Sequence, residues 1–229
     1  MQLFYLKSPE KDIILSTEES KHATKILRKK ENDILNFTDG KGNFYKAKIT
    51  VADTRKCRLE IISSEQKRKQ HKYHLHIAIA PTKNIDRFEW FLEKATEIGI
   101  DEITPIICSR SERKVIKTER CTRILISSMK QSLKFHLPKL NEAISLNDFM
   151  NKNFEDAKYI AHCEDGAKKE LKKVSKKEKY LILIGPEGDF KQKEIDLALQ
   201  NQFKEVSLGT SRLRTETAGI IAAHTISIK

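Results

Sequence analysis

The sequence predicts an α/β protein with a small β-rich domain followed by a larger domain built on a parallel sheet. Residues 1 to about 65 contain short apolar runs of strand length around one helical stretch, which is typical of a small barrel. From residue 73 onward strands and helices alternate, which indicates a mostly parallel sheet with helices on both faces. We therefore expect one domain at residues 1–70 and a second at 73–229.

The first domain is expected to contain one helix, at about residues 18–29. His22, Lys25, Arg28 and Lys29 are spaced so that they would lie along one side of that helix. A glycine-containing turn at 39–43 predicts a hairpin, and the polar stretch 65–72 predicts a linker. The expected strands are 3–6, 13–15, 33–37, 44–49 and 58–62.

The second domain shows a clear alternation of elements. Apolar residues recur at helical spacing from Ile85 to Ile98, and Gly99 follows as a C-cap. Further helices are predicted over 118–135, stopped before Pro138, and over 217–228. The expected strands are 75–80, 103–108, 159–163, 180–184 and 206–208.

Two strand-to-loop junctions near the C-terminus are the most informative stretches. One apolar run stops at Gly185 and continues as Pro-Glu-Gly, and the other stops at Gly209 and runs into a polar loop. The pattern predicts two loops side by side at the carboxyl ends of neighbouring parallel strands, where open α/β sheets bind ligands. Neither loop has the glycine-lysine pattern of a phosphate cradle or the glycine pattern of a dinucleotide site, so nucleoside triphosphates and NAD are poorly supported.

The charge balance favours a polyanionic partner. Lys and Arg number 44 against 32 Asp and Glu, which gives a net charge of +12, and such a surplus is typical of nucleic-acid binding. The alternative is a lysine-rich surface that only confers solubility. For the block Lys168–Lys179 we prefer a solvated loop.

The sequence favours a cytoplasmic protein with no membrane segment. The N-terminus lacks the apolar core of a signal peptide, and no apolar run approaches the roughly twenty residues of a membrane helix. The four cysteines are far apart, which argues against zinc and favours reduced thiols that fill the core. We expect no metal.

Taken singly, the motifs of the second domain are weak. Gly-Pro-Glu-Gly alone is a turn, and Arg214 or Glu216 alone would be a surface ion pair. His162, at a strand end, is more often a satisfied core histidine than a catalyst. The chemistry alone supports an RNA-directed α/β protein with an unidentified ligand loop.

The motifs in combination resemble a known family. Lys94–Ile100, Ile103–Pro105, Gln131-Ser132, Ile184–Gly188 and Leu208–Ala218 occur in the order seen in the RsmE family. Those proteins are 16S ribosomal RNA uridine N3-methyltransferases of the SPOUT superfamily. The resemblance covers essentially the whole chain and includes the segment His22–Arg28, which looks like that family's PUA-like RNA-binding domain.

The resemblance implies a fold and a cofactor. The expected fold is a small PUA-like β-barrel domain followed by a SPOUT-type parallel sheet with a deep trefoil knot, an exception to the rule against knots. The cofactor would be S-adenosyl-L-methionine, bound by loops whose glycines let the backbone come close. By resemblance, the cofactor-binding residues are Ile184, Gly185, Gly188, Leu208, Gly209, Leu213, Thr217 and Ala218.

The resemblance also implies the reaction and the partners. The catalytic candidates are Arg214, to stabilise charge on a uracil oxygen, and Glu187 or Glu216, either as proton acceptor or to order the loop. Lys25, Arg28, Lys29 and Arg110 are the candidate RNA contacts. The partners would be 16S rRNA within the small ribosomal subunit and a second copy of the chain, with the last helix helping to form a homodimer.

The chain departs from the family pattern at two places. The family usually has a second glycine where this chain has Asp189. The family's first loop arginine is displaced by one position, onto Arg212, so Arg214 carries over cleanly and Arg212 does not.

Overall fold

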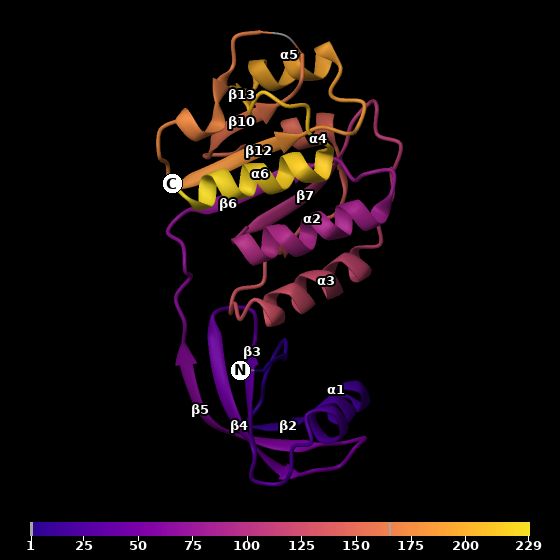
Figure 1. Cartoon of the computed structure of the whole chain (residues 1–229), viewed down its shortest axis with the longest axis vertical. Coiled ribbons are helices and arrows are strands. Elements are labelled where there is room, and N and C mark those ends of the chain that lie inside the picture. Colours follow the sequence, from indigo (N-terminus) through magenta and orange to yellow (C-terminus); the bar gives the residue numbers. More distant parts are fainter. Residues whose placement is uncertain (1, 165) are drawn as a thin grey trace. The chain divides into compact units, whose positions relative to one another are not determined.

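The computed structural model describes residues 2–164 and 166–229 and divides the chain into two compact units (Figure 1). The first unit comprises the chain up to Lys69 together with Met129–Leu137, and the second comprises Gln70–Ser128 and Pro138–Lys229. The segment 129–137 therefore belongs to the first unit, although the sequence pattern placed it in the second domain.

The first unit is a half-barrel of five strands in the order β1-β3-β4-β5-β2. The β1–β3 pair is parallel and the others are antiparallel, with irregularities in β4 that bend the sheet around its core. Phe4, Phe37, Ile49 and Leu59 are the largest fully buried side chains of that core. The β-rich first domain is thus confirmed. Its strands are β1 (Leu3–Tyr5), β2 (Asp12–Ile14), β3 (Ile34–Thr38), β4 (Asn43–Val51) and β5 (Arg58–Gln66).

The helix of the first unit is shorter than predicted. It consists of α1 (Thr17–Lys21) and a π-helical turn η1 (His22–Ile26), in which Leu27 N–H donates to His22 O at 2.9 Å. Arg28 has a φ of +54° and ends the helix. Because the π turn changes the spacing and Arg28 is left-handed, the prediction that Lys25, Arg28 and Lys29 share one helical face is wrong.

The second unit is built on an eight-stranded sheet with the path β11-β13-β10-β12-β6-β7-β8, and β9 also pairs with β7. All of its pairings are parallel, as predicted. The long strands are nearly continuous apolar runs because both faces are covered. The strands are β6 (His74–Ile79), β7 (Glu102–Ile107), β8 (Lys139–Leu140), β9 (Ile144–Ser145), β10 (Ala157–Ala161), β11 (Lys169–Glu170), β12 (Lys179–Ile184) and β13 (Lys204–Ser207).

Helices cover both faces of this sheet. Ala78 and Ala80 point to a core shared with α4 (Leu146–Met150) and α5 (Gln192–Gln200). On the other face α2 (Ile85–Ile98) and α6 (Thr215–Ser227) lie side by side (Figure 1). A Cβ at Gly219 would come within 2.7 Å of the Phe91 ring, so this glycine allows the close packing of the two helices.

Some boundaries differ from the predicted ones. Helix α2 and its Gly99 cap, at a φ of +125°, agree with the prediction. Helix α3 (Thr118–Gln131) ends before the predicted Phe135, because Leu133 takes a φ of +54°. Strand β5 continues through Gln66 into the stretch predicted as linker. The remaining element is a short 3-10 turn, η2 (Leu171–Lys173). None of the described helices is long and apolar enough to cross a membrane.

Candidate functional site

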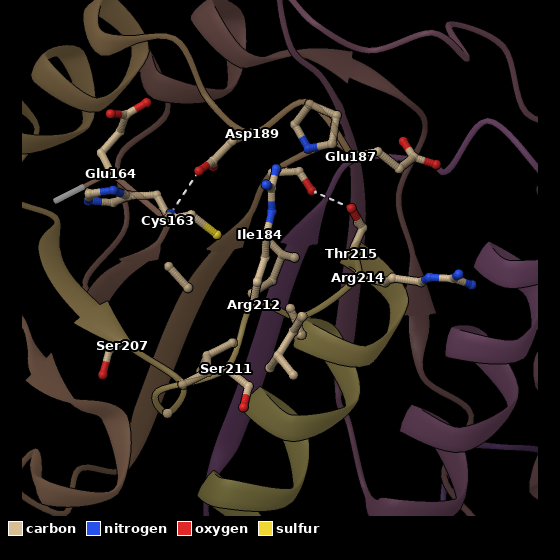
Figure 2. Close-up of a pocket in the computed structure, with 18 of the residues that line it drawn as sticks. Cys163, Glu164, Ile184, Glu187, Asp189, Ser207, Ser211, Arg212, Arg214 and Thr215 are labelled. Atoms are coloured by element: carbon tan, nitrogen blue, oxygen red, sulfur yellow. Dashed lines mark hydrogen bonds between the residues drawn. The ribbon is translucent and has the colours of Figure 1, made fainter.

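A cavity of about 770 Å³ opens at the carboxyl ends of β10, β12 and β13 in the second unit (Figure 2). The loops after these three strands line it, together with Arg110 from the loop after β7 and the first turn of α6. The lining residues with a predicted role are Arg110, Ile184, Gly185, Glu187, Gly188, Leu208, Gly209, Leu213, Arg214 and Ala218. Glu216 and Thr217 are not among the lining residues.

The two predicted junctions meet here, but by a different route from the expected one. Strands β12 and β13 are not neighbours, because β10 lies between them. The loop after β13 crosses the end of β10, and Thr215 Oγ1 at the start of α6 donates to Gly185 O at 3.0 Å (Figure 2). The expectation of neighbouring strands was wrong, whereas the expectation that the two loops lie side by side holds.

The three glycines of the site serve different purposes. A Cβ at Gly185 would lie 3.0 Å from the Phe190 ring, and one at Gly188 would lie 3.3 Å from the Arg110 side chain. Gly209 differs, since nothing lies within 4 Å of its Cβ position and its φ is +135°. The absence of a side chain at Gly185 and Gly188 allows Phe190 and Arg110 to pack closely. At Gly209 the space that a side chain would fill is open to the cavity.

The loop Gly209–Leu213 offers free backbone groups to a ligand. Within the described residues, no hydrogen bond joins its backbone to another residue. Ile184 is buried and Leu208 and Leu213 are half-buried at the cavity wall. Apolar walls with convergent backbone donors and acceptors suit an uncharged planar group such as a base.

Asp189, which stands where the resemblance predicted a glycine, has a left-handed backbone conformation. Its φ is +60°, a left-handed conformation that aspartate adopts more readily than most residues. Its Oδ2 accepts from Cys163 N–H at 2.7 Å (Figure 2). Its Oδ1 accepts from its neighbour Phe190 N–H at 2.8 Å. The aspartate therefore ties the loop after β12 to the end of β10.

The loop after β10 was missed by the sequence analysis, except for His162. Lys168 Nζ donates to His162 O at 2.8 Å and to Glu164 O, and it lies 3.3 Å from His162 Nδ1. Because an ammonium only donates, Nδ1 accepts and the proton lies on Nε2, which contacts Glu205 Oε1 at 2.9 Å. His162 is thus a satisfied buried histidine, as predicted, and Lys168 folds this loop into the cavity wall.

Cys163 is exposed at this wall, so the prediction that every cysteine fills the core is wrong for it. The other three cysteines are buried, and none of the four forms a disulfide. Burial and the charge of Asp189 raise the pKa of the Cys163 thiol, although the nearby Arg212 and Lys168 act in the opposite direction. The thiol is therefore protonated at neutral pH and is a poor nucleophile.

Glu187 lines the cavity rim but its carboxylate points away from the interior (Figure 2). Its Oε1 accepts from Lys83 N–H at 2.8 Å, in the loop between β6 and α2. The same loop is held by Arg113, whose guanidinium donates to Thr82 O and Lys83 O at 3.0 and 2.7 Å. This geometry gives Glu187 an ordering role for two loops.

Arg110 also stabilises the loop after β12. Its Nη1 donates to Gly188 O at 2.8 Å and to Phe190 O at 3.3 Å. The guanidinium is thereby engaged with the loop after β12, which leaves less of it available for an RNA contact.

Arg214 and Glu216 flank the start of α6. Arg214 is exposed at the N-cap and its side chain extends away from the cavity interior, toward the rim (Figure 2). Glu216 is buried, with Oε1 3.9 Å from Arg87 Nε, and its Oε2 has no hydrogen-bond partner within the described chain. Buried carboxylate oxygens are nearly always hydrogen-bonded, so among the described residues this oxygen is an exception.

The predicted RNA contacts Lys25, Arg28 and Lys29 do not line the cavity. Lys25 and Arg28 are exposed and Lys29 is half-buried, all in the first unit. Among the described residues, no cluster of three or more His, Cys, Asp or Glu side chains is arranged to hold a metal ion.

Comparison with known proteins identifies the class. The model of an RNA methyltransferase domain matches residues 69–227, and that of an RNA methyltransferase PUA domain matches residues 15–62. The chain is 31% identical over 216 residues to ribosomal RNA small subunit methyltransferase E of Rickettsia conorii, covering 92% of this chain and 87% of that protein. Fold and site together therefore define an RNA methyltransferase with a PUA domain.

Solved structures agree with this class. A probable rRNA methyltransferase from Porphyromonas gingivalis has a TM-score of 0.94 and 40% identity, covering 100% of this chain and 99% of that one. The ribosomal RNA small subunit methyltransferase E of Neisseria gonorrhoeae bound to S-adenosyl methionine has a TM-score of 0.89 and 25% identity, covering 100% and 97%. The chain belongs to the ribosomal RNA small subunit methyltransferase E family.

Proposed function

We propose that this protein transfers a methyl group from S-adenosyl-L-methionine to N3 of a specific uridine in 16S rRNA, with the assembled small ribosomal subunit as substrate. The observation that carries the proposal is the cavity, where Gly209 leaves open space and the backbone groups of residues 209–213 have no hydrogen-bond partner among residues 2–164 and 166–229. The relative from Neisseria gonorrhoeae is bound to S-adenosyl methionine, which supports this cofactor.

The residues of the cavity fit the cofactor. It carries no phosphate, so no lysine cradle or helix N-terminus is required. Gly209 and the free backbone of its loop would contact the adenine, and Ile184, Leu208 and Leu213 would form the apolar wall. Gly185, Gly188 and Ala218 complete the wall, while Thr217 lies on α6 beside it.

The chain would contribute charge stabilisation to the reaction. The bound cofactor supplies an electrophilic methyl group. Loss of the uracil N3 proton leaves negative charge on the base oxygens, and the guanidinium of Arg214, which is exposed at the cavity rim, would stabilise that charge. We assign Glu187 to loop ordering because of its bond to Lys83 N–H. We assign Glu216 to ordering the start of α6, because it lies outside the cavity lining with Oε1 3.9 Å from Arg87 Nε.

We propose that residues 1–70 form the RNA-binding domain and residues 73–229 the methyltransferase domain. The match to an RNA methyltransferase PUA domain supports the first assignment. Lys25, Arg28 and Lys29 would contact RNA phosphates. Their replacement by alanine is expected to weaken binding and its salt dependence, and unchanged binding would place the RNA elsewhere.

We also propose a trefoil knot and a homodimer. The crossing of the loop after β13 over the end of β10 supports the knot. A slow refolding phase that prolyl isomerase does not accelerate is expected, and its absence would contradict the threading. Helix α6 has the half-buried Ile220 and Ile221 beside its buried residues, the following Ile228 is exposed, and Trp90 is exposed on the adjacent α2. A helix that is apolar all round is normally covered, so sedimentation should show a dimer.

The activity is tested with purified protein, S-adenosyl-L-methionine and small ribosomal subunits from a strain that lacks this protein. Mass mapping of the RNA should show 3-methyluridine, and Arg214→Ala should bind the cofactor in calorimetry but lose turnover by about 100-fold. Formation of 2′-O-methylribose would place the protein in another branch of the superfamily.

The competing function is an RNA-binding adaptor that retains the fold without the chemistry. Calorimetry distinguishes the two, because folded adaptor should give no heat with S-adenosyl-L-methionine or its demethylated product.

A further inference from the structure

The loop after β7 ends in a segment without internal support, residues Lys114–Lys117. Val115 is 75% exposed, more than any other large hydrophobic residue of the described chain. Lys114 and Lys117 are also exposed. Within the described residues, no hydrogen bond joins the backbone of Lys114, Val115 or Ile116 to any other residue. The segment therefore presents two cations, an apolar side chain and free backbone groups to whatever lies outside it.

The base of this segment is held firmly. Arg113 donates to Thr82 O and Lys83 O, and Arg110 donates to Gly188 O in the cavity wall. Ser111 Oγ accepts from Cys108 N–H at 2.9 Å and closes the turn between them. The exposed segment thus starts four residues after Arg110, whose side chain lines the cavity, on a loop that two arginines fix to the neighbouring loops.

The paired and unpaired charges lie in different parts of the loop. We call residues 110–113 the base of the loop and Lys114–Lys117 its tip. At the base, Lys83 pairs with Glu112 at 2.7 Å, and in α3 Arg120 pairs with Glu89. At the tip, neither Lys114 nor Lys117 has an ion-pair partner among the described side chains. Unpaired lysines around an exposed apolar side chain match a nucleic-acid strand, because the cations contact phosphates and the apolar group contacts a base or sugar face.

We propose that residues Lys114–Lys117 bind the substrate RNA beside the target base, in place of the contact expected from Arg110. The proposal rests on the proposed function. Arg110 then acts as a positioning residue, since it connects the RNA-binding segment to the cofactor loop through Gly188 O. The contact is specific to the RNA strand, so it changes the KM for RNA and leaves cofactor binding unchanged.

The first test is the double variant Lys114→Ala/Lys117→Ala, with filter binding of small ribosomal subunits at several salt concentrations. We expect about 10-fold weaker binding and a slope of log affinity against log salt that is shallower by about 1.5, as expected for two lost phosphate contacts. Calorimetry should show unchanged affinity for S-adenosyl-L-methionine.

The matched control is Lys176→Ala/Lys177→Ala. These exposed lysines precede β12 at the amino edge of the sheet, and their removal changes the net charge by the same amount. This control should bind RNA with the wild-type slope. Equal losses in both double variants would mean that only net charge matters, which overturns the proposal.

The second test isolates the apolar contact. Val115→Thr keeps the side-chain volume and replaces one methyl group by a hydroxyl, so we expect the KM for RNA to rise about 3-fold with an unchanged salt slope. A wild-type KM in this variant together with wild-type binding in Lys114→Ala/Lys117→Ala would overturn the assignment. Dissociation of a dimer by either variant would instead identify the segment as a subunit interface.

Failure of the proposed function gives a different result. In that case the wild-type protein itself neither methylates nor binds small ribosomal subunits. If the wild-type protein methylates them and the tip variants do so with the same KM, only the assignment of this segment is wrong.

Discussion

Individual glycines of the site differ in what their missing side chain makes possible. A Cβ at Gly185 or Gly188 would contact Phe190 or Arg110, so substitution there disturbs protein packing. At Gly209 the space beyond the backbone is open and belongs to the cavity. The sequence marks all three positions equally, and only the structure separates a packing glycine from a binding glycine.

Gly209→Val is therefore expected to abolish cofactor binding without unfolding the protein. The branched side chain fills the space where the adenine would lie, and we expect affinity for S-adenosyl-L-methionine to fall by about 100-fold, equivalent to about 3 kcal/mol. Calorimetry measures the affinity, and circular dichroism checks the fold.

The control for backbone strain is Gly166→Val. Gly166 has a φ of +146° with nothing within 4 Å of its Cβ position, but it does not line the cavity. Both variants carry a similar conformational cost of about 1–3 kcal/mol, and only Gly209→Val should lose the cofactor. Normal cofactor affinity in Gly209→Val would refute the placement of this loop.

At the scale of elements, local patterns were predictable and pairings between distant strands were not. Helix α2 followed from its own periodicity and from Gly99, because both signals lie within the element. The π turn at His22–Ile26 depends on how the helix packs into its core, and no simple spacing rule marks it. The predicted helical face of Lys25, Arg28 and Lys29 failed for that reason.

The site shows the same limit. The loops after β12 and β13 were identified from their glycines, but the insertion of β10 between these strands is a non-local pairing. The loop after β10, which contains Cys163, Glu164 and Lys168, therefore also enters the site. Lys168 bonds mainly to backbone carbonyl oxygens, and such bonds require no recognisable sequence motif. A polar run directly after a predicted strand was the signal available for it.

Asp189 joins two of these loops, and its substitution tests that link. Asp189→Gly keeps the left-handed backbone but loses the bond to Cys163 N–H, so the second unit should lose about 1–2 kcal/mol of unfolding free energy. Asp189→Ala loses the same bond and adds strain at a φ of +60°, so it should be less stable still.

Urea unfolding followed by tryptophan fluorescence measures this effect. The chain has a single tryptophan, Trp90 on α2, so the signal reports on the second unit. The expected order of stability is wild type, then Asp189→Gly, then Asp189→Ala. A glycine variant as stable as wild type would show that the Cys163 contact contributes nothing.

On the scale of the whole second unit, a polar network lies toward the amino ends of β6 and β7, whereas the cavity lies at the carboxyl ends of the strands. His76 Nε2 lies 2.7 Å from Thr104 Oγ1, and Asn141 Nδ2 donates to both Thr104 Oγ1 and Glu102 Oε1 at 2.7 Å. His76 is buried against the rings of Phe149 and Phe154. This imidazole has no role in the proposed chemistry, so its effect should be on stability alone.

The pH dependence of stability should follow from His76. Burial lowers the pKa of His76 from 6.5 to about 4, with His74, Lys139 and Lys152 acting in the same direction and Glu102 opposing them. Between pH 6.5 and about 4 the unfolded chain takes up a proton that the folded chain does not. The stabilisation is therefore complete above pH 6.5 and is lost as the pH falls, by on the order of 3 kcal/mol.

Glu102 acts in a lower range, because bonds from Asn141 and Lys139 lower the pKa of this carboxyl below 4.5 despite its partial burial. His76→Gln removes the titrating group and keeps a polar side chain, so it should flatten the stability curve between pH 6.5 and 4. The measurement is urea unfolding by Trp90 fluorescence at half-unit pH intervals. Above pH 7 variant and wild type should have parallel curves, which serves as the internal control. If the wild-type and His76→Gln curves also have the same slope between pH 6.5 and 4, the acid sensitivity of the second unit arises from other groups.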